Sequence, residues 1–290
     1  MKYIIALLTF GLVSQAFAAN RQVEHFYQAD DGKIVNIFAM EYGEQNIKPQ
    51  AGAGNETKIS GFTNTVLFEK GFTNWLSVGG RFNYAVVATD IEAAQLNHNA
   101  GGLENPEIYA NARMNLADSI ELRGGLVYSV ALENRFIDQD GIQTNTSLGR
   151  SSLFPFLGFN FNLGGVHTGI RLTQEVALSD IQSENTSAVV TKTSGAEMTS
   201  VDVYGEFLFD DWTTGLLVKY ATFADTDTNG VSGQVPGFLR VNLYVPFYIN
   251  EALTLRPEVF YDLYQDDVQG TTQLDSIDEY ALNLSARFSF

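Results

Sequence analysis

Apolar and polar residues alternate with a period of two along most of the chain, which is the pattern of strands with one apolar and one polar face. In the segment 75–87, for example, Phe82 lies on the apolar face and Arg81 on the polar one. The alternation predicts strands at 33–42, 58–69, 75–87, 108–116, 120–132, 152–163, 166–177, 199–209, 212–222, 237–248, 253–264 and 279–290. It does not assign Asn36 or Asn64 to a face, so the facing of the first two strands stays open.

The connections between these strands alternate between short and long. The short ones are 70–74, 117–119, 164–165, 210–211 and 249–252, and the long, polar ones are 43–57, 88–106, 133–150, 178–198, 223–236 and 265–278. An even number of strands with short turns at one end predicts a transmembrane antiparallel up-and-down β-barrel. We therefore expect an all-β fold of about 12 strands, with short periplasmic turns and long extracellular loops. The number rises to 14 if a long loop contains another hairpin.

A secreted β-sandwich would also alternate. Strands longer than the usual five or six residues, the regular connections, and aromatic residues near the short turns, such as Trp75 and Phe209, favour the barrel. Pro155, Pro246 and Pro257 oppose it, because each removes a ladder hydrogen bond from a sheet that has no free edge. In a barrel these prolines require bulges or rim positions.

The first 18 residues, MKYIIALLTFGLVSQAFA, have the charged start, the apolar stretch and the small-residue site of a cleavable signal peptide. We expect a periplasmic N-terminal segment at 19–32 and the barrel at 33–290. No stretch approaches the roughly 20 apolar residues that a helix needs to cross a bilayer. The sequence therefore predicts export without a transmembrane helix.

Charge and cysteine content narrow the function classes. The formal net charge is -17 at pH 7, which argues against nucleic-acid binding and against simple electrostatic binding to anionic lipid. There is no cysteine, so disulfides and a lipid anchor on an N-terminal cysteine are both excluded.

The signal peptide, the alternating strands and the last strand, YALNLSARFSF, together resemble the outer-membrane β-barrels of Gram-negative bacteria. Within that class the chain looks most like monomeric porins and twelve-stranded oligosaccharide or solute channels, without a specific family motif. The resemblance implies an outer-membrane location, with lipid and lipopolysaccharide as partners. It also implies that Tyr280, Phe288 and the terminal Phe290 serve as the signal that the barrel-assembly machinery reads.

If the apolar face meets lipid, the polar face lines the lumen. The candidate pore-lining residues are Arg81, Arg113, Arg123, Arg171, Asp202, Glu206, Lys219, Arg240, Arg256, Glu258, Asp262 and Arg287. Charged rings of this kind control which ions pass through a channel. The arginines fall on two groups of neighbouring strands, which predicts basic walls opposed by acidic ones. In the alternative interpretation, the charges pair with one another as a polar core that closes the lumen.

The long loops are acidic, with residues such as Asp90, Asp138, Asp180 and Asp266. An acidic mouth concentrates cations and repels anions, so we expect a channel that favours cations. Alternatively, the acidic loops serve solubility and bridge divalent cations to surface lipid.

One loop matches the first half of a calcium-binding loop. In ADTDTNG, Asp225, Asp227 and Asn229 have the alternate spacing of D-x-D-x-N-G. The position of the bidentate glutamate is Pro236, so a solvated turn at Asn229 and Gly230 is the favoured interpretation and calcium the alternative.

Together these features predict a porin-like channel for passive diffusion of small hydrophilic solutes or ions, without a cofactor. The alternative is a closed barrel that acts in surface interaction or adhesion through its acidic loops. An outer-membrane hydrolase ranks third, because His98 could pair with Asp90 as a general base but no catalytic motif surrounds it.

Overall fold

The computed structural model describes residues 27–49, 56–91, 96–138, 143–209, 213–264 and 274–290, so the predicted signal peptide lies outside the described residues. Within these ranges every regular element is a strand. No helix of the described residues is long and apolar enough to cross a membrane.

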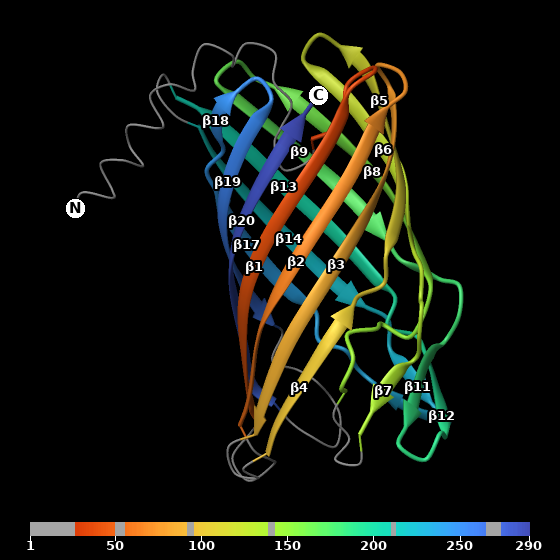
Figure 1. The fold of residues 1–290 in the computed structure, drawn as a ribbon. Coiled ribbons are helices and arrows are strands. Elements are labelled where there is room, and N and C mark those ends of the chain that lie inside the picture. Colours follow the sequence, from red (N-terminus) through yellow and green to blue (C-terminus); the bar gives the residue numbers. More distant parts are fainter. Residues whose placement is uncertain (1–26, 50–55, 92–95, 139–142, 210–212, 265–273) are drawn as a thin grey trace, which may run out of the picture.

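Twelve strand positions form one closed antiparallel barrel, which confirms the predicted fold class (Figure 1). The wall strands are β1 (Ile34–Pro49), β2 (Thr57–Gly71), β3 (Leu76–Ile91), β5 (Glu107–Ala117), β6 (Ile120–Ser129), β8 (Ser152–Asn162), β9 (Val166–Gln174), β13 (Met198–Leu208), β14 (Thr213–Phe223), β17 (Phe238–Tyr244), β19 (Leu253–Tyr264) and β20 (Leu274–Ser289). Three short strands extend this wall: β4 (Leu96–Leu103) on β3, β10 (Val176–Ala177) on β8, and β18 (Phe247–Asn250) on β19. The first strand pairs with the last, and this pairing closes the barrel.

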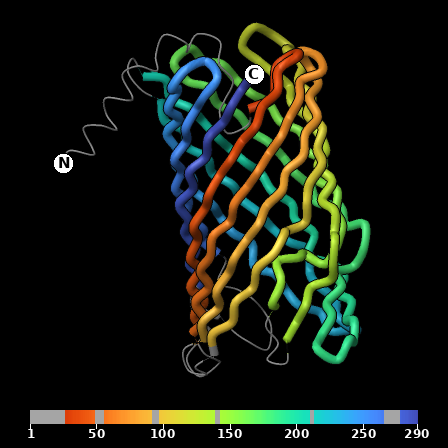
Figure 2. Tube along the Cα trace, viewed as in Figure 1, coloured from red at the N-terminus to blue at the C-terminus, as the bar shows by residue number. Residues whose placement is uncertain are grey.

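The long loops form a second, five-stranded sheet of their own. Its order is β16-β15-β12-β11-β7, from β7 (Arg135–Ile137), β11 (Ile181–Asn185), β12 (Val190–Ser194), β15 (Thr226–Thr228) and β16 (Val231–Gly233). In Figures 1 and 2 this extracellular sheet lies at the end of the barrel opposite the C-terminus. These hairpins do not enter the barrel wall, so the wall has twelve strands and not fourteen.

The predicted loops at 43–57 and 88–106 are wrong in large part. β1 and β2 remain paired as far as Ile47 and Thr57, and β3 continues to Ile91, where β4 pairs with it. We attribute the difference to a position beyond the lipid-facing band, where a strand need not have one apolar face. The apolar-polar alternation that marks a strand in lipid is therefore absent there, although the backbone pairing continues.

The two faces of the wall differ as the alternation predicts. Phe82 and Leu282 are more than half exposed on the outer face, whereas Ala85 and Ala281 on the inner face are only 2% and 1% exposed. A continuous apolar surface of this kind fits contact with lipid. The strand register also settles the open assignment: Asn64 pairs with Met40 and Tyr84, so it faces outward.

The three prolines lie where the ladder is interrupted. Pro155 falls in the gap between the β8–β9 and β8–β10 pairings, and Pro246 and Pro257 fall in the gap between β17–β19 and β18–β19. Because the register is the same on both sides of each gap, a proline removes a bond without shifting the strands. They therefore lie at interruptions of the ladder, and not at bulges.

Four aromatic rings of the inner wall lie flat over glycines directly opposite on the neighbouring strand. The pairs are Tyr109 over Gly79, Phe156 over Gly125, Tyr204 over Gly169, and Tyr244 over Gly215. A Cβ at any of these glycines would overlap the ring. Glycine at these positions therefore lets the rings lie along the wall and keeps them out of the lumen.

We expect Gly215→Ala to destabilise the barrel by about 1–3 kcal/mol, the usual cost of overpacking. Tyr244 is 1% exposed and its hydroxyl donates to Glu206, so the ring has no free space into which it could move. The measurement is urea unfolding of the refolded protein in lipid vesicles. Gly43→Ala is the control, because a Cβ there would meet Ala281 at an ordinary 3.6 Å. Equal stability of the two variants would contradict the prediction.

Candidate functional site

All the predicted pore-lining residues lie on the inner face of the wall. The strand register places each of them on the same side of its strand as the buried inner-wall residues. They are Arg81, Arg113, Arg123, Arg171, Asp202, Glu206, Lys219, Arg240, Arg256, Glu258, Asp262 and Arg287. The register also reveals how they are connected, which the sequence pattern does not.

Most of these charges lie on a single row of directly opposite residues that crosses strand after strand. This charged row runs through Arg113, Arg123, Gly158, Arg171, Asp202, Lys219, Arg240, Asp262, Glu279 and Gln45. Because barrel strands are tilted and staggered, such a row climbs as it goes around the wall. It rises from Arg113 near the periplasmic turns to Gln45 near the extracellular end.

The arginines pair with carboxylates on the same or the neighbouring strand. Arg171 donates to Asp202 Oδ2 through Nε and Nη2 at 3.1 and 2.9 Å. Arg240 donates to both oxygens of Asp262 at 2.7 and 2.6 Å, a bidentate pair. The remaining pairs are Arg81 with Glu107, Arg123 with Glu121, and Arg256 with Glu258. The basic and acidic charges therefore do not form the separate opposed walls that the sequence predicted, because they are interleaved along the wall.

Within three of these pairs the carboxylate is the deeper partner. The side chains of Asp202, Asp262 and Glu258 are 2%, 0% and 7% exposed, whereas those of Arg171 and Arg240 are 27% and 28% exposed. In these pairs water in the lumen contacts the guanidinium group more than the carboxylate, whereas in the Arg123–Glu121 pair the carboxylate is the more exposed partner, at 20% against 9%.

Buried side chains line one part of the inner wall, and two cavities lie in the lumen. On β13 to β19 the inward residues Tyr204, Leu217, Ala221, Tyr244 and Phe260 are buried. The periplasmic cavity, of about 1120 Å³, is lined by residues that include Arg113, Glu121, His167 and Arg287. The mid-lumen cavity, of about 540 Å³, lies along the inner faces of β1 to β9 and reaches Lys219 and Arg256.

Residues Tyr27 to Lys33, here called the N-terminal strap, enter the periplasmic mouth of the barrel. Gln28 and Ala29 are 2% and 0% exposed. The backbone N–H of Ala29 donates to Glu69 Oε1 at 2.8 Å, and the Gln28 side chain donates to the carbonyl of Asn111 at 3.1 Å. Tyr27 lines both cavities, so the strap lies where they meet.

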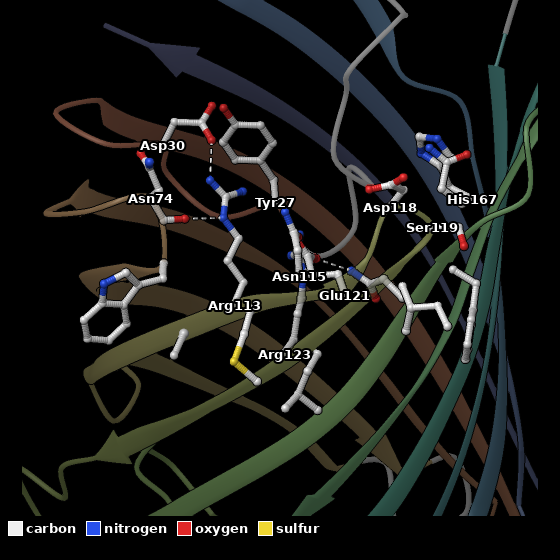
Figure 3. Close-up of a pocket in the computed structure, with 18 of the residues that line it drawn as sticks. Tyr27, Asp30, Asn74, Arg113, Asn115, Asp118, Ser119, Glu121, Arg123 and His167 are labelled. Carbon is white, nitrogen blue, oxygen red and sulfur yellow. Dashed lines mark hydrogen bonds and ion pairs between the residues drawn. The ribbon is translucent and has the colours of Figure 1, made fainter.

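Two arginines hold the strap in place. Arg113 bonds Asp30 Oδ1 at 2.5 Å and the carbonyl of Asn74 at 2.8 Å, as Figure 3 shows. The guanidinium of Arg287 lies 3.8 Å from the centre of the Tyr27 ring, a cation–π contact. These two predicted pore residues therefore contact the strap as well as the lumen.

The sequence did not reveal several lumen carboxylates, among them Glu41, Glu69 and Glu107. Glu69 is 3% exposed and accepts from the Tyr109 hydroxyl at 3.1 Å. It was missed because the facing of the first two strands was open. Thr63 and Thr65 are polar and lie on the same face of β2 as Glu69, and they are the signal that could have found it.

The extracellular ends of β8, β9 and β13 meet at a buried ion pair. Arg150 bonds Glu175 Oε1 at 2.7 Å, and Glu175 also accepts from the Ser152 hydroxyl and the backbone N–H of Met198. Arg150 additionally donates to the carbonyl of Ala196 at 3.0 Å. This cluster anchors the loops at the mouth.

The remaining sequence candidates are located as follows. His98 on β4 bonds Asp138 at 2.9 Å and not Asp90. Asp227 accepts from the backbone N–H of Gly230 in the β15–β16 hairpin turn, where Asn229 has a φ of 55°. Among the described residues no group of three or more His, Cys, Asp or Glu side chains is placed to hold a metal ion, and calcium binding at Asp225, Asp227 and Asn229 stays a prediction.

The aromatic residues of the last strand face lipid. Phe288 packs edge-on against Phe38 with ring centres 6.0 Å apart, and the ring of Phe290 is stacked with it at 6.5 Å. Tyr280 is 38% exposed. Their recognition by the assembly machinery stays a prediction.

No protein-family model and no curated protein matches the chain by sequence. An outer-membrane channel from Pseudomonas putida F1 has a similar structure, with a TM-score of 0.68 at 12% identity over 93% of this chain and 100% of that one. The transport unit of the autotransporter AIDA-I from Escherichia coli gives 0.56 at 11% identity over 98% and 97%. The KdgM porin gives 0.46 at 10% identity over 87% and 99%. The first two likenesses show that the chain has the fold of outer-membrane β-barrels, which confirms the class that the sequence resembles.

We expect Asp30→Ala to raise the conductance of the barrel, because the strap loses its ion pair with Arg113 and no longer narrows the periplasmic mouth. The measurement is conductance in planar bilayers. Asp31→Ala is the matched control: it removes the same charge one position away, from an exposed residue that contacts β2 through its backbone. If both variants conduct like the parent protein, the strap does not limit conduction.

Proposed function

We propose that the protein is a porin-like channel through which small hydrophilic solutes cross the outer membrane by passive diffusion. The observation that carries the proposal is the lumen: two adjoining cavities whose lining is rich in charged and amide side chains. A barrel with a fully packed core would instead fill this space with side chains, as smaller barrels do.

The fold supports the same proposal, since the Pseudomonas putida structure with the same architecture is a channel. The charged and amide side chains of the lining favour hydrophilic solutes. The size of the mid-lumen cavity, about 540 Å³, and the N-terminal strap at its end limit passage to small ones. The hydrolase interpretation paired His98 with Asp90, whereas the structure pairs it with Asp138.

Lipid and lipopolysaccharide at the outer face, and insertion by the barrel-assembly machinery, are part of the proposal. The outer ends of β1 and β2 present a polar surface above the apolar band, where Lys58 bonds Glu44 at 2.7 Å. This is a suitable surface for contact with lipid head groups.

The test is single-channel recording of the refolded mature protein in planar bilayers, combined with swelling of proteoliposomes in neutral sugars of increasing size. Stepwise openings and swelling limited to small sugars are the expected result. Folding is checked independently by the shift in gel mobility on heating. A folded protein that neither conducts nor admits sugars would contradict the proposal and favour the closed barrel that acts through its extracellular sheet.

A further inference from the structure

Lys219 is the exception among the basic residues of the charged row. Within the part of the chain that the structure describes, its ammonium makes no hydrogen bond and no ion pair. Its neighbours on the row are Asp202 and Arg240. Asp202 accepts both bonds from Arg171, and the next carboxylate, Asp262, is held by Arg240. The nearest carboxylates are thus committed to guanidinium groups.

An ammonium that is partly buried and makes no direct ion pair is costly, and an anion that supplies such a pair is correspondingly favoured. Lys219 lies at intermediate exposure and lines the mid-lumen cavity. A solute that reaches the mid-lumen cavity therefore meets the Lys219 ammonium.

The other charged side chains that line the mid-lumen cavity are also mostly positive. Its lining includes five basic side chains, Arg81, Arg123, Arg171, Lys219 and Arg256, but only two carboxylates, Glu69 and Glu107. Glu69 accepts hydrogen bonds from the backbone N–H of Ala29 and from the Tyr109 hydroxyl. Glu107 forms an ion pair with Arg81 at 3.0 Å. The carboxylates of Asp202 and Glu258 lie behind their arginines and do not line the cavity. The side chains that a solute in this cavity can contact therefore include more basic groups than carboxylates.

Size and shape favour an organic ion over a bare inorganic one. About 540 Å³ lies within the range of pockets that hold small organic molecules. Tyr109, Tyr204 and Phe156 present aromatic surface to the same space, and the Arg171 guanidinium lies 5.3 Å from the Phe156 ring centre. Guanidinium groups suit carboxylates, because they can donate two parallel hydrogen bonds.

We propose that the mid-lumen cavity is a binding subsite for small organic carboxylates, with the Lys219 ammonium as the counter-ion. The inference rests on the proposed channel function and names its solute class. It opposes the preference for cations that the acidic loops predicted, because selectivity is set where the solute is most closely surrounded, and there the wall is basic.

The experiment uses the refolded full-length barrel, with benzoate as the probe. In planar bilayers under a potassium chloride gradient, we expect a reversal potential of anion-selective sign and a concentration-dependent block of the current by benzoate. Lys219→Met should move the reversal potential toward zero and raise the half-blocking concentration about tenfold, since a charge-assisted bond is lost. Lys219→Arg should retain both properties.

Lys58→Met is the matched control. It removes the same charge from the outer face, where Lys58 bonds Glu44, and should leave selectivity and block unchanged. If Lys219→Met behaves like this control, or if the channel favours cations, the subsite proposal is wrong although the channel function stands.

Calorimetric titration of benzoate into the detergent-refolded protein separates the two proposals. Binding that is lost in Lys219→Met and kept in Lys58→Met supports the subsite, even for a protein that does not conduct. Absence of benzoate binding to the folded parent protein overturns the subsite, whatever the bilayer recordings show.

Discussion

The pairing of β1 with β20 is the constraint on which the rest of the structure depends. A bilayer core offers no water to bond exposed backbone groups, so a sheet can span it only without a free edge. The pairing runs from Val35 with Ser289 to Pro49 with Leu274. At the periplasmic end, Ile34 and Phe290 exchange two backbone hydrogen bonds. Together with the registers of the other strand pairs, this register fixes the stagger of the barrel, and these registers decide which inward side chains become neighbours.

The charged row follows from that stagger. Arg171, Asp202, Lys219, Arg240 and Asp262 come from five strands that follow one another around the wall, and the stagger places them on one climbing row. Two pairs of directly opposite residues on this row have opposite charges and form ion pairs, Arg171 with Asp202 and Arg240 with Asp262. The pairing is incomplete because the row carries more basic groups than carboxylates in its middle section, and this leaves Lys219 facing the lumen.

The sequence predicted the strands and their faces because the alternation of apolar and polar residues within a strand does not depend on which strand lies beside it. It could not predict the register, since sliding a strand by two residues leaves every side chain on the same face. For this reason Arg240 was assigned to the lumen but its bond with Asp262 was not foreseen. The facing of β1 and β2 was ambiguous for a different reason: their inner residues Ile37 and Leu67 are apolar and line the mid-lumen cavity beside the strap. The strap itself has no periodic signal.

The negative charge of the long loops does not rule out a preference for anions in the mid-lumen cavity, because loop carboxylates have structural contacts. Several of them hold the extracellular sheet together: Asp138 bonds His98, Glu184 accepts from Asn134, and Asp227 accepts from the turn N–H of Gly230. A carboxylate in such a contact contributes to loop structure, and screening by salt weakens its field over the roughly 10 Å of a Debye length. The lumen arginines are enclosed by the wall and are screened far less. If the barrel is the channel proposed above, we therefore expect its selectivity to depend on the few charges around the mid-lumen cavity more than on the net charge of the chain.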